Sequence, residues 1–416
     1  MVPMHNLSSD PESEHHLFET FGVELEYMIV DRRSFKVLPI ADHVLRDDDG
    51  CIENELDRGA LAWSNELALH ALELKTNGPI NSLSGLEAKF QHDVRRINEL
   101  LKAGAARLMP SAVHPFMDPY IETKLWPHGD AGIYNTFDRI FNCRGHGWGN
   151  LQSAHLNLPF CGNDEFVRLH GAIRLALPLI PALAAASPYL DGKDTGLLDS
   201  RLDQYRKNCA KIFSITAHVV PEAVPGIREY HRDILQRIYG DLAPHDPEGI
   251  LRYEWTNARG AIARFDRQTV EIRVIDVQEC PLADLAVLMV LVGIIKKLAF
   301  DPDSVAAGSM LPADRLAVIL KETIRDGEQT TITDTDYLRC LGFQTKTLRA
   351  NEVWSGLIET LPDIPDPYRG ALEIILGQGT LASRMKRFAG KCTQERLVET
   401  CRALCDCLEE GRLLVP

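Results

Sequence analysis

The sequence predicts an α+β protein in which strands form a sheet, helices flank it and a helical C-terminal region follows. Three observations lead to this prediction. Residues 22–31 and 269–276 alternate with the two-residue period of a strand. Residues 84–108 carry an apolar stripe at helical spacing, and further helical patterns, separated by Pro and Gly, follow position 300. We expect a flexible tail at 1–17, the main domain at 18–300 and the helical region at 301–416.

Composition and charge restrict the class of protein. The chain has 416 residues, 45% of them apolar and 25% charged, which is usual for a globular protein. Its net charge of −14 argues against nucleic acid as the main partner, because phosphate binding needs clustered Lys and Arg. The apolar run 281–300 is interrupted by Asp284, Lys296 and Lys297, so we expect a buried helix and no membrane span.

The ten cysteines show no disulfide-like spacing, and the polar first residues do not resemble a secretion signal. Both observations predict a protein of the reducing cytoplasm. Cys401, Cys405 and Cys407 form the main cluster. Because Cys401 and Cys405 lie four residues apart on an expected helix, packing is favoured over metal binding.

The strand expected at 22–31 carries two carboxylates on one face. Glu24 and Glu26 share that face with Met28 and Val30, so it begins charged and ends apolar. Two like charges about 7 Å apart repel each other and are costly to desolvate. One interpretation is a solvated strand end. The other is a divalent cation such as Mg²⁺, which takes carboxylate oxygens from a rigid scaffold.

Residues 63–75 fit either a helix or a strand. Glu66 and Glu73 lie seven positions apart, so they share a face only if the segment is helical. The following segment, 84–108, is expected to be a long helix that begins with a Ser-x-x-Glu capping box and covers one face of the sheet.

Residues 150–158 are expected to form a strand on which His155 and Asn157 point the same way. A lone histidine on a strand is more often structural than a ligand, so both roles stay open for His155. Helices are expected at 165–186 and 200–212. The glycine-flanked loop between them lacks the spacing of a P-loop.

The strand expected at 269–276 places Glu271 and Arg273 on one face. The two side chains could simply neutralise each other. Alternatively, Glu271 holds a metal while Arg273 steadies a transferring phosphoryl group. Arg264, just upstream, adds a second positive charge or is a solvated surface residue.

Helical patterns continue to the end of the sequence and predict an all-helical appendage, whose apolar faces would supply a homodimer surface. These patterns lie at 312–326, 334–341, 351–359 and 394–412.

Taken together, these segments resemble the glutamate–cysteine ligase family, and within it the bacterial type 2 carboxylate–amine ligase branch. The resemblance covers about residues 21–298. It rests on Gly22-Val-Glu-Leu-Glu26, Glu73, His114-Pro-Phe116, His155, Ser187-Pro188, Asp194-Thr-Gly196 and Thr269-Val-Glu-Ile-Arg-Val-Ile-Asp276.

The resemblance implies a glutamine synthetase-like catalytic domain at 18–300 with a curved, largely antiparallel sheet. It also implies an enzyme that uses ATP and Mg²⁺, or Mn²⁺, to phosphorylate a carboxylate, typically the γ-carboxylate of glutamate. An amine then displaces phosphate and leaves an amide. The implied metal ligands are Glu24, Glu26, Glu73, His155 and Glu271, and Arg273 is the implied phosphate contact that acts in catalysis with Glu271.

The chain departs from the branch at residues 195–205, where its loop is longer. Arg201 and Arg206 therefore compete for one basic position and, with Arg264, are the candidates for cofactor binding. Glu66 has no family position, and no pattern identifies the amine. Two alternatives are a phosphotransferase acting on a guanidino nitrogen and a non-catalytic homologue that binds nucleotide or amino acid.

Overall fold

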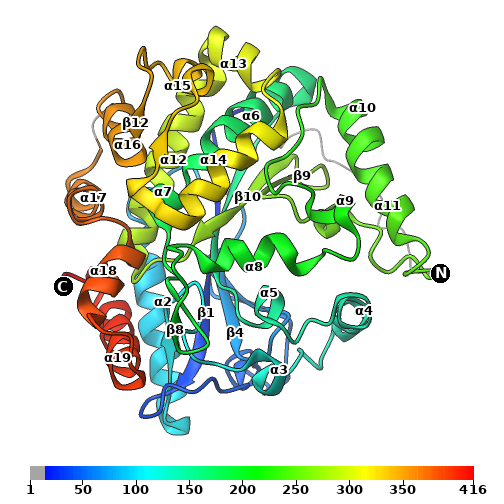
Figure 1. Cartoon of the computed structure of the whole chain (residues 1–416). Coiled ribbons are helices and arrows are strands. Elements are labelled where there is room, and N and C mark those ends of the chain that lie inside the picture. The colour runs from blue at the N-terminus through cyan, green and yellow to red at the C-terminus, as the bar shows by residue number, and fades with distance from the viewer. Residues whose placement is uncertain (1–14, 363) are drawn as a thin grey trace.

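The structure, a computed structural model, describes residues 15–362 and 364–416, so most of the tail expected at 1–17 lies outside the described residues. An open sheet of eight strands runs through the molecule, with helices packed around it (Figure 1). The expected α+β class and the antiparallel sheet are confirmed. The path of the sheet is β2 (Glu55–Asp57), β3 (Leu61–Asn65), β4 (Ala71–Thr76), β1 (Gly22–Asp31), β6 (Ser153–Pro159), β10 (Thr269–Asp276) and β9 (Ala261–Arg264), with β5 (Ala106–Met109) pairing with β1.

The central strand β1 has a different neighbour along each half of one edge. Its first half pairs with β6, its second half pairs with β5, and β4 lies along the other edge. Val23, Leu25, Tyr27 and Ile29 share one face of β1 and are buried in the main core, as the alternation predicts. The other face presents Glu24 and Glu26, followed by Met28 and Val30.

The apolar end of that second face is covered by α19 (Gln394–Glu410). Met28 and Val30 belong to the same buried cluster as Cys401 and Cys405 of this helix. The cysteines therefore pack against the sheet, and among the described residues they join no group arranged for a metal ion.

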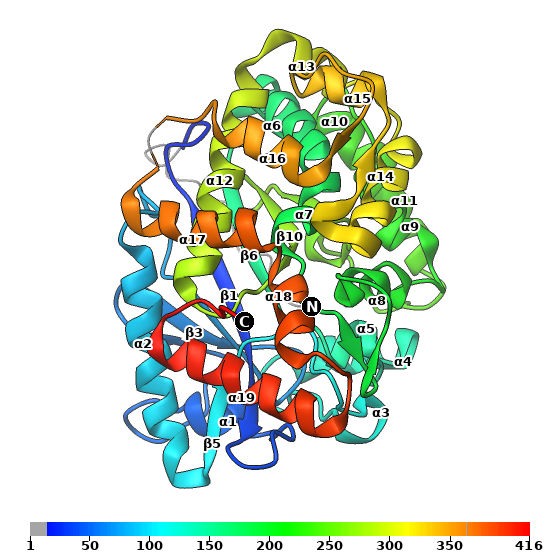
Figure 2. The ribbon, with the colours of Figure 1, turned by 60° about the vertical axis from the view of Figure 1, so that its left-hand side comes forward.

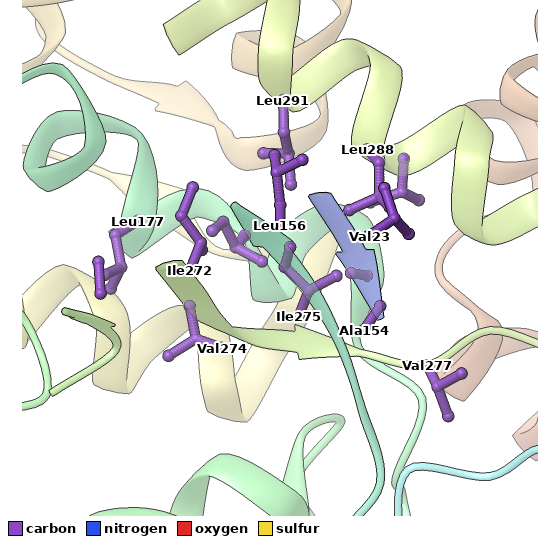
Figure 3. Packing of buried hydrophobic residues seen from close by; sticks show 14 of the residues in the cluster. Val23, Ala154, Leu156, Leu177, Ile272, Val274, Ile275, Val277, Leu288 and Leu291 are labelled. Atoms are coloured by element: carbon purple, nitrogen blue, oxygen red, sulfur yellow. The ribbon is translucent and has the colours of Figure 1, made fainter. Parts of the chain in front are cut away.

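The mainly apolar face of the sheet, opposite the glutamates, packs against α12 (Pro281–Phe300). Figure 3 shows Leu288 and Leu291 of this helix beside Val23, Leu156 and Ile272 from three neighbouring strands. The helix α12 is apolar on nearly every side because it also contacts α2 (Leu86–Leu101), α6 (Gly162–Ala176) and α17 (Asp366–Gln378). Within the described part of the chain, no helix has the length and apolar character needed to cross a membrane.

Two local expectations differ from the structure, and one open alternative is decided by it. Residues 63–75, which fit either a helix or a strand, form the hairpin of β3 and β4. The helix expected at 84–108 ends at Leu101, and Leu108 lies in β5 instead. Its N-terminus has no capping box, because Gly85 occupies the N-cap position with a left-handed φ of 81° and no side chain caps the helix.

Other helices frame the second face of the sheet. In Figure 2 the sheet lies between α2 on one side and α4 and α5 on the other. The bounds of the remaining elements before residue 301 are α1 (Ala41–Val44), α3 (Pro119–Glu122), α4 (Ala131–Phe141), α5 (His146–Gly149), α7 (Pro181–Ala184), β7 (Tyr189–Leu190), β8 (Lys193–Asp194), α8 (Ser200–Asn208), α9 (Phe213–Thr216), α10 (Ile227–Tyr230) and α11 (Gln236–Leu242).

The C-terminal region shares its core with the sheet. Its elements are α13 (Pro302–Gly308), α14 (Ala313–Asp326), β11 (Thr331–Ile332), α15 (Thr335–Cys340), β12 (Leu348–Arg349), α16 (Ala350–Ile358), α17, α18 (Leu381–Ala389) and α19. A fully buried ion pair joins Arg384 of α18 to Glu279, which follows β10. Residues 301–416 are thus mainly helical, but they pack as part of the body that carries the sheet.

Candidate active site

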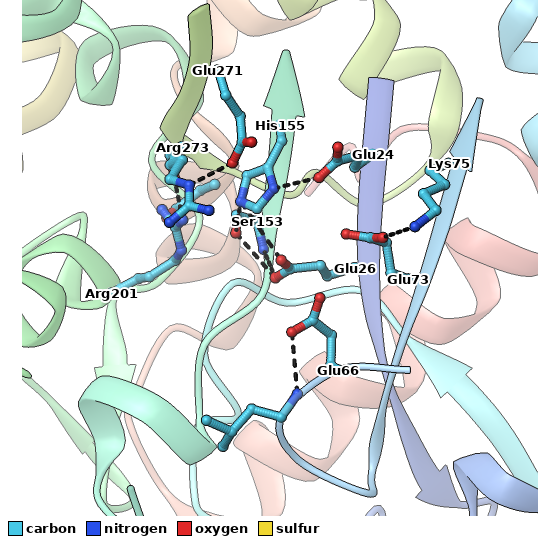
Figure 4. A network of polar contacts seen from close by, with 12 residues as sticks. Glu24, Glu26, Glu66, Glu73, Lys75, Ser153, His155, Arg201, Glu271 and Arg273 are labelled. Atoms are coloured by element: carbon cyan, nitrogen blue, oxygen red, sulfur yellow. Dashed lines mark hydrogen bonds and ion pairs between the residues drawn. The ribbon is translucent and has the colours of Figure 1, made fainter. Parts of the chain in front are cut away.

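A cavity of about 340 Å³ opens on the charged face of the sheet. Its floor is made by side chains from β1, β4, β6 and β10, which point to the same side because their positions alternate in step (Figure 4). The register places Glu24 opposite His155, Glu26 opposite Glu73, and Glu271 opposite Asn157. Antiparallel pairing therefore gathers carboxylates that are far apart in the sequence.

His155 lies between the two carboxylates of β1. Its Nδ1 is 2.8 Å from Oε2 of Glu24, and its Nε2 is 3.6 Å from Oε1 of Glu26. The backbone N–H and the hydroxyl of Ser153 donate to Glu26 at 2.7 and 3.0 Å. Burial alone would lower the pKa of His155, but its bond to Glu24 and the nearby carboxylates raise the pKa to about 9. Burial opposes ionisation of Glu24, yet His155 holds its pKa below the ordinary value.

Glu73 joins the group from β4, and Glu66 enters from the loop that follows β3. Glu73 accepts a hydrogen bond from Ser64 at 2.7 Å and lies 3.2 Å from the ammonium of Lys75. Glu66 accepts a hydrogen bond from the backbone N–H of Leu67 at 3.3 Å. The two glutamates therefore reach one site through a hairpin, with Glu66 in its connecting loop, and not through a shared helix face.

The carboxylates of the floor form two overlapping groups that could hold a cation. Glu24, Glu73 and His155 make one, and Glu26, Glu66 and Glu73 make the other, each with one ligand atom per residue within 4.8 Å of the others. Burial and the charge of Glu24 raise the pKa of Glu73 to about 7. Burial and the charges of Glu26 and Glu73 raise the pKa of Glu66 well above its usual range. Both shifts arise from desolvated, mutually repelling carboxylates, a repulsion that a divalent cation would relieve.

Glu271 is held by two arginines. Nε of Arg273 donates to one of its oxygens at 2.5 Å, and Nη1 of Arg264 donates to the other at 3.2 Å. Burial would raise the pKa of Glu271, but the charge of Arg273 keeps it below the ordinary value. The mutual neutralisation considered for Glu271 and Arg273 is therefore present. Both residues still line the cavity, beside His155 and Glu24.

The structure separates the two arginines that compete for one basic position. Arg201 lines the cavity, but its guanidinium is buried, pairs with Asp276 at 3.2 Å and donates to the backbone oxygen of Arg273 at 2.6 Å. Arg206 is partly exposed, pairs with Asp203 on the same helix and does not line the cavity.

A second cavity, of about 330 Å³, adjoins the first and shares Glu24, Lys75 and Arg267 with it. Its other walls include Phe21, Pro79 and Pro159 together with several glycine and polar residues. The two cavities thus meet where both signs of charge are present.

Sequence reasoning did not single out Lys75, Ser153 or Arg267. Lys75 and Ser153 had a usable signal, because each lies two positions from a candidate ligand on the same strand and so shares its face. Arg267 had none, since it lies in the turn between β9 and β10. Glu66, which had no family position, is part of the second cation group.

Comparison with known proteins gives one family. The family model described as glutamate–cysteine ligase family 2 matches residues 20–400. A protein of Archaeoglobus fulgidus, which bears the name "Uncharacterized protein", is 32% identical over 394 residues, covering 94% of this chain and 99% of its own. A protein of Rubrobacter xylanophilus named "Putative glutamate--cysteine ligase 2-3" is 30% identical over 200 residues, about half of each chain (47% and 48%).

Two solved structures share the fold at low sequence identity. A glutamate–cysteine ligase from Francisella tularensis, crystallised with AMP, superposes with a TM-score of 0.56 at 13% identity and covers 94% of this chain and 89% of its own. A bifunctional glutathione synthetase from Pasteurella multocida has a TM-score of 0.55 at 16% identity and covers 94% of this chain and 52% of its own.

Proposed function

Because this chain belongs to glutamate–cysteine ligase family 2, we propose that it is an ATP-dependent ligase that joins the γ-carboxylate of glutamate to an amine through an acyl phosphate. The observation that carries the proposal is the floor of the larger cavity. There, the two sets of potential cation ligands that share Glu73 lie beside Glu271, which is paired with Arg264 and Arg273.

The two groups fit divalent cations by their chemistry. Carboxylate oxygens suit Mg²⁺, and a set that includes His155 also suits Mn²⁺. We assign Glu24, Glu73 and His155 to one cation and Glu26, Glu66 and Glu73 to another, with Glu271 beside them. Bound cations would neutralise the triphosphate, which these glutamates would otherwise repel.

The second cavity is the proposed nucleotide site. Its apolar walls suit a base, and Lys75 and Arg267, which it shares with the larger cavity, suit phosphates. The AMP bound to the Francisella tularensis ligase supports a nucleotide site in a protein of this fold. Lys75 is held between Glu55 at 2.7 Å and Glu73 at 3.2 Å, so its charge is fixed at the junction of the two cavities.

The proposed reaction has two displacements. A carboxylate oxygen of glutamate attacks the γ-phosphorus of ATP and ADP leaves. The nitrogen of the amine then attacks the acyl carbon and phosphate leaves, so that an amide forms. Arg273 and Arg264 offset the charge that develops on the phosphoryl oxygens, and the rigid sheet supplies orientation. No protein nucleophile is needed.

None of the ten cysteines, all of which lie in the described residues, forms a disulfide bond, which supports the proposed cytoplasmic location. A homodimer through the helices after residue 300 remains a prediction that oligomeric state measured by light scattering would test.

The experiment is phosphate release from ATP and Mg²⁺ with a matrix of acids and amines, with mass detection of the amide. Hydroxylamine, a small nucleophile, reports the acyl phosphate as a hydroxamate. Glu271→Gln should abolish release and leave the fold intact, whereas Glu399→Gln on the exposed side of α19 should behave as wild type. Full activity in Glu271→Gln would overturn the site assignment. Nucleotide binding without release across the matrix would favour a non-catalytic homologue.

A further inference from the structure

Three aromatic rings form one wall of the larger cavity, above the carboxylates of its floor. They are Phe137 of α4, Trp148 of α5 and Trp255 of the 3₁₀ turn Glu254–Thr256. Phe137 lies at the centre, with ring centroids 5.2 Å from Trp148 and 5.9 Å from Trp255. We call these three residues the aromatic wall. They come from segments that contribute no carboxylate to the floor.

The rings of the wall are fixed before any ligand arrives. The indole N–H of Trp148 donates to the backbone oxygen of Asn208 at 3.3 Å, and its ring stacks on Phe141 at 6.0 Å. Trp255 stacks on Tyr253 at 5.4 Å, with the two planes only 8° apart. A site whose side chains are already ordered loses little conformational entropy when a ligand binds.

Packing within the protein does not account for the whole wall. Phe137 is buried, but Trp148 and Trp255 are only partly buried and border open cavity space. Because the N–H of Trp148 is already used, this residue offers a ligand its ring and no donor. The wall is therefore suited to an apolar or aromatic group, unlike the charged floor beneath it.

Of the three substrates of the proposed ligase, the amine is the one left to contact the aromatic wall. The nucleotide is assigned to the second cavity, and the charged groups of glutamate need charged partners, which these rings do not supply. The part that remains is the side group of the amine. The side chain of cysteine, one methylene and a thiol, would leave most of three rings uncovered.

We propose that the acceptor amine carries an aromatic ring, which lies against Phe137, Trp148 and Trp255 while its nitrogen points to the floor. The inference rests on the ligase function proposed above and names the class of its acceptor. A ring is favoured over an alkyl chain because aromatic pairs at centroid separations of about 4.5–7 Å attract each other beyond simple burial. The tilted arrangement of the wall, at 47° and 51°, leaves ring faces and edges available for such contacts.

The test compares acceptors at fixed ATP, Mg²⁺ and glutamate. The probes are 2-phenylethylamine, 2-cyclohexylethylamine, ethylamine, 1,4-diaminobutane, cysteine and hydroxylamine. We expect kcat/KM for 2-phenylethylamine to exceed the values for ethylamine and cysteine at least tenfold, and to exceed the value for its cyclohexyl counterpart. In Trp255→Leu and Trp148→Leu the ratio of 2-phenylethylamine to ethylamine should fall at least fivefold. Phe300 is an exposed aromatic residue that lines neither cavity, so the control variant Phe300→Leu should keep the wild-type ratio.

The outcomes separate this inference from the proposed function. Hydroxamate formation with no preference for 2-phenylethylamine would leave the ligase standing and overturn the aromatic acceptor. Equal kcat/KM values for 2-cyclohexylethylamine and 2-phenylethylamine would overturn it as well, because the wall would then act as a plain apolar surface. A preference for 1,4-diaminobutane would also overturn it, because the wall would then act as a cation site. If hydroxylamine yields no hydroxamate with any acid, the proposed function fails and the acceptor class fails with it.

Discussion

The substitution Arg201→Met distinguishes a structural arginine from one that binds a ligand. Arg201 is 1% exposed. Its guanidinium makes two contacts: it pairs with the carboxylate of Asp276 at 3.2 Å and donates to the backbone oxygen of Arg273 at 2.6 Å. The resemblance to the family made Arg201 a candidate for cofactor binding, whereas these contacts make it a support for β10. Methionine keeps most of the apolar stem and removes the charge and all the donors.

The expected loss follows from what the exchange leaves behind. Asp276 keeps its hydrogen bonds from Ala186 at 2.8 Å and Ser187 at 3.0 Å, but loses its cation in a buried position. Removing one partner of a buried ion pair costs about 3–5 kcal/mol of unfolding free energy. Burial raises the pKa of Asp276 even in the intact protein. The folded variant therefore binds a proton more readily than its unfolded chain, so its stability falls as the pH rises and the deficit is smaller at pH 5 than at pH 8.

Urea unfolding at the two pH values, with kcat and KM for ATP, tests this reasoning. The matched control is Arg206→Met on the same helix, where a partly exposed pair with Asp203 predicts a change below about 0.5 kcal/mol. The role of Arg201 in holding β10 would be refuted if Arg201→Met lost less than about 1 kcal/mol and yet raised KM for ATP, since such a result belongs to a ligand contact.

Four further predictions follow from the site. Mn²⁺ should raise the unfolding temperature in calorimetry, and Glu73→Gln, at the position shared by both cation groups, should remove most of the gain; an equal gain in the variant would contradict the shared ligand. Because the pKa of His155 is about 9, a proton must leave this side chain before Mn²⁺ binds, so Mn²⁺ affinity measured by titration calorimetry should rise about tenfold from pH 7 to pH 8. For the same reason the stability of the metal-free protein should fall across pH 7–9. An Mn²⁺ affinity independent of pH would exclude His155 as a ligand. Gly147→Ala should cost about 1–3 kcal/mol in urea unfolding, since its Cβ would lie 2.8 Å from a side-chain carbon of α8, while Gly132→Ala, which meets no atom within 4 Å, should cost little. Arg267→Ala should raise KM for ATP at least tenfold with stability unchanged, and an unaltered KM would remove Arg267 from the nucleotide site.

Alternation along single strands predicted much of the charged floor. Side-chain direction on a strand is a local property, so the shared faces of Glu24 with Glu26, and of Glu271 with Arg273, could be read from the sequence alone. The register that places β1, β6 and β10 side by side is not local. It entered the expectations only through the family resemblance.

The contacts that sequence reasoning missed depend on tertiary structure. Glu66 and Glu73 meet because residues 66–70 turn the chain between two paired strands, and no period within the segment encodes that turn. Likewise, Ser84 and Glu87 have the spacing of a capping box, but Glu87 accepts a hydrogen bond from Tyr368 of α17 instead. A tertiary hydrogen bond from a residue distant in the sequence therefore replaced the local capping interaction that the spacing predicted for Glu87.

The covering of β1 by α19 has a consequence for synthesis on the ribosome. Val30 is translated early, whereas Cys405, which lies in the same buried cluster, follows some 375 residues later, a delay on the order of 20–75 s at typical translation rates of about 5–20 residues per second. Until then Met28 and Val30 lack the part of their cover that α19 supplies, and the first half of β1 also waits for its partner β6. A strand edge that is still unpaired tends to associate with other chains. The yield of folded protein in a foreign host should therefore rise with slower growth or added chaperones, even if the folded protein itself is stable.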